Sequence, residues 1–122
     1  MNPLAKPKGF TLIEVLVALV ILTFALLALA GLMVTTTKNN AFGGHVTEAA
    51  TFAQDKLEEL RAIKWESLLD GNNTDQRGGS TGINYTRNWR VATSGSLKTI
   101  TIEVTWIDRT PHLIKLISVL SE

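Results

Sequence analysis

One apolar run dominates the hydropathy pattern of this chain. Residues 15–34 contain no charged side chain, and only Thr23 and Gly31 interrupt the apolar sequence. A helix of this length reaches about 30 Å, the thickness of the hydrocarbon core of a bilayer. The pattern therefore predicts a membrane-spanning helix. Glu14 stands directly before the run, where a carboxylate in lipid costs about 2.5–3.5 kcal/mol unless it has a partner.

A second helical pattern follows the polar residues 35–40. Its apolar positions recur at intervals of three and four, which places them on one face of a helix. These positions are Val46, Ala49, Ala50, Ala53, Leu57 and Leu60. Gly43 and Gly44 interrupt the pattern at a cost of about 1 kcal/mol each relative to alanine. They mark either a kink where the helix opens or a local bend without consequence.

Residues 66–82 are rich in Gly, Asn, Asp and Ser, and we expect them to form a turn-rich loop. Asp70, Asn72 and Asp75 suggest a calcium site, because carboxylate and amide oxygens suit a hard cation. Their spacing departs from the EF-hand loop and no bidentate Glu follows in its place. Asx turns in a solvated loop are therefore the preferred interpretation.

The C-terminal third alternates between apolar and polar residues with a period of two, which is typical of half-buried strands. The apolar positions are Ile83, Tyr85, Trp89, Val91, Ile100, Ile102, Val104 and Trp106. Residues 93–96 and 108–111 predict turns, and residues 112–120 a third strand. The expected fold is α+β: a long N-terminal helix, transmembrane in its first half, packed on a small three-stranded antiparallel sheet. Trp89 and Trp106 are expected in the core rather than in a ligand site.

Composition narrows the function classes. The chain has 122 residues, no cysteine, and 12 basic against 11 acidic side chains, so neither disulfides nor a nucleic-acid footprint is expected. His45 and His112 have no second ligand at metal-binding spacing. Gly78 and Gly79 lack the Lys-Ser/Thr of a phosphate loop. We therefore expect no enzyme, no metal and no cofactor.

Residues 9–15, which read GFTLIEV, resemble the processing signature of type IV prepilins and the related pseudopilins. The resemblance implies that a prepilin peptidase cuts after Gly9 and N-methylates the new N-terminal residue, Phe10. It also implies that Glu14, the fifth residue after the cut, is needed for assembly. The expected segments are a leader (residues 1–9), the transmembrane or filament-core half of the helix (residues 10–34) and an exported pilin-like domain (residues 35–122).

An ordinary secretory signal peptide is the rival interpretation, because Ala28-Leu29-Ala30 resembles its cleavage site. The apolar run is longer than a signal peptide needs, and a carboxylate stands at its head, which favours the prepilin. Lys6 and Lys8 precede the run and only Lys38 closely follows it. The positive-inside rule then keeps the leader in the cytoplasm and exports the C-terminal domain from the bacterial inner membrane, before its entry into a filament.

Glu14 has a simple interpretation and a functional one. It could reach the membrane surface and stay hydrated there at little cost. Cleavage before Phe10, however, creates an amine one helical turn away, and lipid favours pairing of the two charges. In a bundle of subunits Glu14 of one copy can neutralise the Phe10 amine of its neighbour, as the resemblance also implies. We prefer this second interpretation.

Three functions remain. The chain is a structural subunit, a membrane-tethered binding module that uses its sheet or residues 66–82, or a membrane-anchored enzyme, for which no catalytic constellation appears. We favour the first. Residues 53–61 and 98–106 resemble minor pilins of the pilus-modification (PilV) type, and also small minor pseudopilins of type II secretion. The implied partners are other pilin or pseudopilin subunits, the prepilin peptidase and the assembly platform of the inner membrane.

Overall fold

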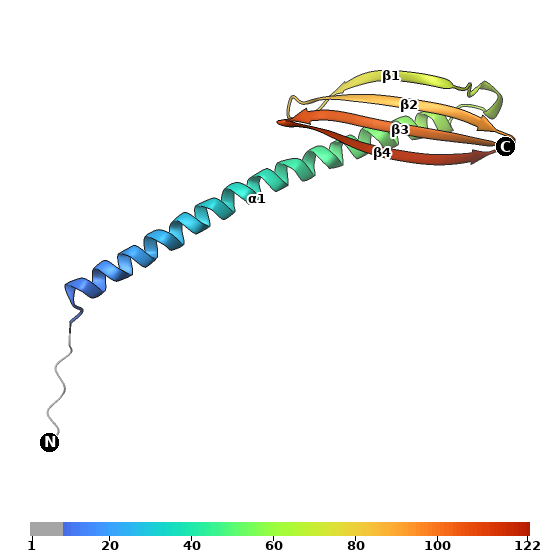
Figure 1. The fold of residues 1–122 in the computed structure, drawn as a ribbon. Coiled ribbons are helices and arrows are strands. Elements are labelled where there is room, and N and C mark those ends of the chain that lie inside the picture. Colours follow the sequence, from blue (N-terminus) through green and yellow to red (C-terminus); the bar gives the residue numbers. More distant parts are fainter. Residues whose placement is uncertain (1–8) are drawn as a thin grey trace. The chain divides into compact units, whose positions relative to one another are not determined.

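The computed structural model describes residues 9–122 (Figure 1). The predictions for residues 1–8 lie outside this part of the chain. The elements are α1 (Leu12–Arg61), the 3-10 helix η1 (Trp65–Ser67), β1 (Gly71–Gly78), β2 (Asn84–Ser94), β3 (Leu97–Asp108) and β4 (Thr110–Ser121). The chain divides into two compact units, one ending at Ala41 and the other spanning Phe42–Glu122. Each unit is described by itself.

The first unit is the apolar part of α1. This helix is long and apolar enough to cross a membrane, with an 18-residue window of mean hydropathy 2.9 and no part of that window buried. The hydroxyl of Thr23 donates a hydrogen bond to the Leu19 carbonyl at 2.8 Å. Because a hydroxyl without a partner is costly in lipid, this bond lets Thr23 stand in an apolar run.

Gly43 and Gly44 do not break α1. The helix continues from Leu12 to Arg61 through both residues, and a Cβ at either position would meet no atom within 4 Å. No close packing against the described residues therefore requires glycine at these two positions. The structure shows a continuous helix here, and whether the helix opens at these glycines on assembly stays a prediction.

The sheet has four strands in the order β1-β2-β3-β4, all antiparallel. The predicted three-stranded meander corresponds to β2, β3 and β4. The prediction of a loop over residues 66–82 is wrong for its central part, because β1 pairs with β2 from Gly71 opposite Val91 to Gly78 opposite Asn84. The polar composition of β1 gives no strand signal of its own. β1 is nevertheless a strand, because its backbone pairs with β2 at the edge of the sheet and an ion pair described below holds it there.

The second half of α1 covers one face of this sheet (Figure 1). The core consists of Ala49, Ala53, Leu60, Leu68, Tyr85, Val91, Ile100, Ile102, Val104 and Trp106. The predicted helix stripe is confirmed, with Val46 and Leu57 partly buried beside it. Trp106 is confirmed in the core at 3% exposure, whereas Trp89 is only partly buried and packs against the core.

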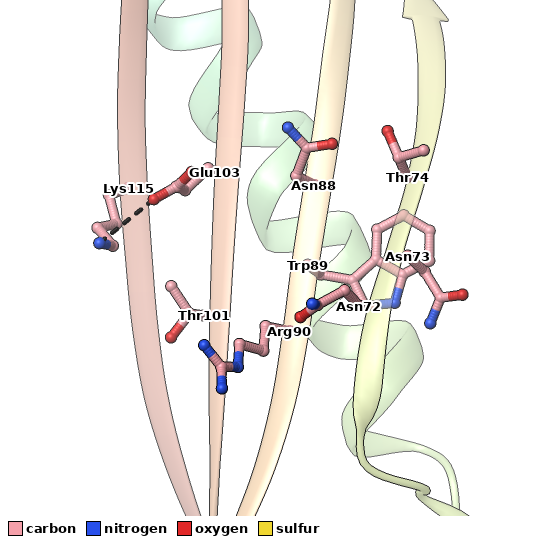
Figure 2. A pocket seen from close by; sticks show the side chains of 9 residues that line it. All are labelled: Asn72, Asn73, Thr74, Asn88, Trp89, Arg90, Thr101, Glu103 and Lys115. Carbon is pink, nitrogen blue, oxygen red and sulfur yellow. Dashed lines mark ion pairs between the residues drawn. The ribbon is translucent and has the colours of Figure 1, made fainter.

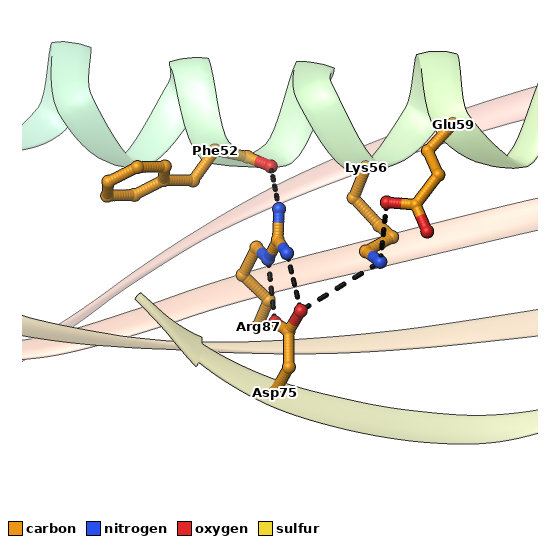
Figure 3. A network of polar contacts seen from close by, with 5 residues as sticks. All are labelled: Phe52, Lys56, Glu59, Asp75 and Arg87. Atoms are coloured by element: carbon orange, nitrogen blue, oxygen red, sulfur yellow. Dashed lines mark hydrogen bonds and ion pairs between the residues drawn. The ribbon is translucent and has the colours of Figure 1, made fainter. Parts of the chain in front are cut away.

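A buried guanidinium joins three elements. Arg87 on β2 is 1% exposed and faces α1. Its Nε and Nη2 atoms donate to the two carboxylate oxygens of Asp75 on β1 at 2.7 and 2.5 Å, and Nη1 donates to the Phe52 carbonyl of α1 at 3.0 Å (Figure 3). This bidentate geometry is the strong form of an ion pair. Arg87 therefore fixes both the polar edge strand and the helix.

Two buried lysines complete the polar part of the interior. The Lys56 ammonium on α1 lies 2.8 Å from Glu59, 3.8 Å from Asp75 and 4.2 Å from the ring centroid of Trp89. Lys98 on β3 donates to the carbonyls of Trp65 and Leu68. Lys98 thereby fastens the segment between α1 and β1 to the sheet.

The burial pattern of β3 predicts very unequal costs for two adjacent truncations. Trp106→Ala should lower the free energy of unfolding by about 3–5 kcal/mol, since it empties a buried aromatic site. Thr105→Ala, on the opposite face, should cost less than about 1 kcal/mol. Chemical denaturation of the two variants in detergent measures both values. Equal costs would contradict the strand register.

The Arg87–Asp75 pair predicts a pH-dependent contribution to stability. The Arg87 guanidinium lowers the pKa of the Asp75 carboxyl below its usual value. Asp75→Ala should cost about 3 kcal/mol at pH 7, because it leaves the guanidinium buried without its counter-charge. A lowered carboxyl pKa stabilises the fold above the unfolded value of about 3.9, and the benefit is lost as the pH falls through the folded value.

Denaturation of wild type and Asp75→Ala between pH 7 and pH 2 tests this assignment. The difference in unfolding free energy should be constant near neutrality and should shrink below about pH 4. Glu58→Ala removes an exposed helix carboxylate and serves as the control, with a small cost at every pH. A difference that persists unchanged at pH 2 would show that the loss comes from packing rather than from charge.

Candidate functional site

The N-terminus of α1 is built around Thr11 and Glu14. The Thr11 hydroxyl accepts a hydrogen bond from the Glu14 backbone N–H at 3.3 Å, and the Thr11 carbonyl accepts from Val15 N–H at 3.2 Å. Thr11 is thus the N-cap, and Glu14 occupies the third helical position of a Thr-x-x-Glu capping pattern. A carboxylate there also suits the positive end of the helix dipole. The sequence analysis missed this structural role, although the T-x-x-E spacing would have predicted it.

Glu14 borders an apolar groove on the surface of the first unit. The residues that line it are Phe10, Glu14, Val15, Ala18, Leu19 and Leu22. Glu14 is the only ionisable residue in this lining. The structure therefore places Phe10 and Glu14 of one chain at the same groove, whereas the predicted pairing of Glu14 with the Phe10 amine of a neighbouring chain stays a prediction. A cationic group placed here would meet a single carboxylate among apolar side chains.

Gly9 and Phe10 lie outside the helix and are exposed, Phe10 at 84%. A Cβ added at Gly9 would meet no atom within 4 Å. Close packing against the described residues therefore does not select glycine at this position. A requirement for glycine at position 9 would have to come from a molecule that recognises the Gly9–Phe10 peptide bond.

A second polar cluster lies where α1 enters the second unit. The Tyr85 hydroxyl donates to Glu48 at 2.9 Å and lies 3.3 Å from His45 Nδ1, while His45 Nε2 is 3.6 Å from Asp108. Burial raises the pKa of Tyr85, so the phenol stays protonated. The backbone N–H of Ser80 holds the pKa of Glu48 below its usual value. These contacts fasten the connection between β1 and β2 to the helix.

The outer face of the sheet carries a shallow polar groove (Figure 2). Two cross-strand rows form most of it. One row consists of Thr74, Asn88, Glu103 and Lys115, and the other of Asn72, Arg90 and Thr101. Glu103 and Lys115 are paired at 3.3 Å. Trp89 packs against the core under the Lys56 ammonium, so its ring is not a stacking platform for a ligand here.

The structure does not bring the proposed calcium ligands together. Asp70 accepts hydrogen bonds from the backbone N–H and the hydroxyl of Thr93, which lower its pKa, whereas Asp75 is bound to Arg87. No group of three or more His, Cys, Asp or Glu residues within the described chain could hold a metal ion. Asp70 instead fastens the start of β1 to Thr93, and Asp75 fastens the middle of β1 to Arg87.

Comparison with known proteins identifies the N-terminal segment. A family model described as the prokaryotic N-terminal methylation motif matches residues 4–30. This match contains the whole GFTLIEV sequence with Gly9, Phe10 and Glu14, and it does not extend to residues 31–122. No curated protein and no solved structure matches the chain. The motif indicates a type IV pilin-like or pseudopilin-like protein.

Proposed function

We propose that this chain is a structural subunit of a type IV pilus, and a minor one. The observation that carries the proposal is the placement of Glu14. The methylation motif matches residues 4–30, and inside it a single carboxylate lies in an exposed apolar groove at the start of a helix fit to span a membrane. Such a helix needs a covering partner, either lipid or other helices of its kind.

The proposed mechanism is charge pairing between subunits. Prepilin peptidase cuts after Gly9 and methylates the new amine of Phe10. While the subunit lies in the membrane, water at the surface solvates this amine and Glu14. In the filament, where helices pack in a water-poor bundle, Glu14 of one subunit neutralises the Phe10 amine of the next. A pair that forms only on assembly favours addition in one register.

Three features of the second unit support a structural role over catalysis. Its buried charges are engaged in holding elements together, as Arg87 and Lys98 show. Its small size and lack of cysteine suit a minor subunit of the PilV type. In this proposal the leader lies in the cytoplasm and residues 35–122 are exported. A minor pseudopilin of type II secretion is the second candidate, because the same motif serves both machines. The partners are other pilin-like subunits, the peptidase and the assembly platform.

The first test concerns processing. Gly9→Val should leave a full-length precursor in the inner membrane, because the β-branched side chain blocks cleavage while the described fold has room for it. Mass spectrometry of the wild type should find Phe10 at the N-terminus with one methyl group. An N-terminus at Gly31 would identify an ordinary signal peptide and end the proposal.

The second test concerns Glu14. Removal of one partner from a buried ion pair costs about 3–5 kcal/mol, so Glu14→Ala should lower incorporation into filaments by two or more orders of magnitude. Insertion should be unchanged or better, since the variant removes a charge from lipid. The measurement compares sheared filaments with membranes from the native host, after equal cleavage has been confirmed.

Glu14→Gln is the matched control for the cap. Glutamine also suits the capping pattern, but it carries no charge to neutralise an amine. Under the proposal, Glu14→Gln fails to assemble as Glu14→Ala does. Normal incorporation of Glu14→Gln would assign Glu14 to helix capping. Normal incorporation of both variants would place the subunit at the filament tip or outside a filament, and would remove this mechanism.

A further inference from the structure

His45 on α1 is a buried histidine that lies between two carboxylates. The residue is 7% exposed. On one side its Nδ1 atom lies 3.3 Å from the Tyr85 hydroxyl, which in turn donates a hydrogen bond to Glu48 at 2.9 Å. On the other side its Nε2 atom lies 3.6 Å from the carboxylate of Asp108, the last residue of β3. The imidazole ring therefore links two acidic groups that belong to different elements.

A count of protons assigns the state of this ring. Glu48 accepts hydrogen bonds from the backbone N–H of Ser80 at 2.6 Å and from Tyr85, and both contacts favour its ionised form. The single phenol proton of Tyr85 is thus committed to Glu48, so the contact with His45 is a hydrogen bond only when Nδ1 carries a proton. A carboxylate also only accepts, so the contact with Asp108 is attractive when Nε2 carries a proton as well.

Loss of one proton breaks this arrangement on one side only. The Tyr85 oxygen faces Nδ1, and Nδ1 keeps its proton to donate to it. Nε2 is then left with a lone pair 3.6 Å from the Asp108 carboxylate, and two acceptors repel each other. The contact through Tyr85 persists, whereas the contact with Asp108 is lost. Imidazole is the side chain that ordinarily gains or loses its proton between pH 5 and pH 8.

Asp108 stands beside a strained turn. Asp108 and Thr110 are paired opposite each other across β3 and β4, so Arg109 alone makes the turn. Arg109 has a φ of 62°, in the left-handed region that residues with a Cβ seldom adopt. Strained backbone persists where the surrounding contacts hold it. The contact of Asp108 with His45 is such a contact, and it joins the turn to α1.

A second histidine, His112 on β4, also faces this turn. Its Nε2 atom lies 3.2 Å from the Thr110 hydroxyl, and its ring packs on Phe42 at 5.0 Å and on Trp106 at 5.4 Å between ring centroids. These partners carry no charge, and a hydroxyl can either donate or accept. A neutral His112 ring therefore keeps all three contacts. Dependence on the charge of the ring is expected at His45, which lies beside carboxylates.

We propose that His45 is a proton-dependent switch of the β3–β4 turn: the doubly protonated ring holds Asp108 against α1, and the ring with one proton releases it. The contacts of Tyr85 with His45 and Glu48 persist in both states, so the release is confined to the turn around Arg109. The switch lies within the second unit and does not depend on a role of the chain in a filament. Its consequence is a local change of the turn, without unfolding of the sheet.

NMR of the full-length chain in detergent between pH 5 and pH 9 tests the switch. The ring-nitrogen shifts of His45 report how many protons the ring holds and at which nitrogen. The backbone amide shifts of Arg109 and Thr110 report the turn, and those amides should shift along the titration curve of the His45 ring. The neutral ring should carry its proton at Nδ1. The Ser80 amide is the control and should shift little, because its acceptor, Glu48, is kept in both states.

Asp108→Asn is the matched variant. An asparagine has nearly the shape of an aspartate, and its amide can either accept from Nε2–H or donate to the Nε2 lone pair. The contact then survives in both protonation states of His45. The ring should still titrate, while the pH-dependent shifts of the Arg109 and Thr110 amides should be lost. His112→Gln removes the titration of the second histidine and should leave these shifts as in the wild type.

Four results would overturn the proposal. The turn amides could follow the titration curve of His112 and lose their shifts in His112→Gln. Their shifts could persist in Asp108→Asn, which would assign them to the charge of the ring and not to the contact. The neutral His45 ring could carry its proton at Nε2, or its protonation could stay the same from pH 5 to pH 9. The last two are read from the wild type alone, so the test does not depend on the folding of a variant.

Discussion

The second unit, Phe42–Glu122, depends on the burial of one guanidinium. Arg87 is 1% exposed, and a charge removed from water in this way costs several kcal/mol unless it is fully paired. Asp75 supplies the counter-charge and the Phe52 carbonyl the remaining acceptor. These two partners lie on an edge strand and on the helix, so satisfying Arg87 determines the position of both. The apolar core explains why α1 covers the sheet. The contacts of Arg87 determine which residues of α1 and β1 lie next to β2.

The same interaction explains which parts of the fold were predictable from sequence. Strict alternation along β3 identified its strand and its buried face, including Trp106, because each second residue is apolar. β1 has no such alternation, and its Asn, Asp and Gly residues favour loops. Its strand rests on backbone pairing with β2 and on the contact of Asp75 with Arg87, residues twelve positions apart. An arginine at an inward-facing position of β2 was the available signal, since a buried cation implies a carboxylate on a neighbouring element.

The N-terminal site was predictable from the sequence for a different reason. Gly9, Phe10 and Glu14 were singled out because the contiguous GFTLIEV sequence resembles a prepilin processing site, and the methylation-motif match to residues 4–30 supports that resemblance. The capping pattern of Thr11 and Glu14 gives Glu14 a place at the helix end that is independent of any role in assembly. The carboxylate stabilises the helix end in the subunit, which compensates part of its cost near lipid. The proposed assembly role therefore does not require a counter-charge for Glu14 inside the monomer.

Within the described residues, the two units thus leave different kinds of groups uncovered. In the apolar half of α1 the residues left uncovered are hydrophobic, and under the proposed function the single carboxylate in the groove would set the register in which a neighbouring helix covers them. In the second unit the buried charges described above are already paired, and the open groups are the backbone edges of β1 and β4. Helix packing is non-directional and supplies most of the area, whereas a strand edge is directional and supplies little. Under the proposed function, contact area would therefore come mainly from the apolar half of α1, whereas an open strand edge could contribute direction but little area.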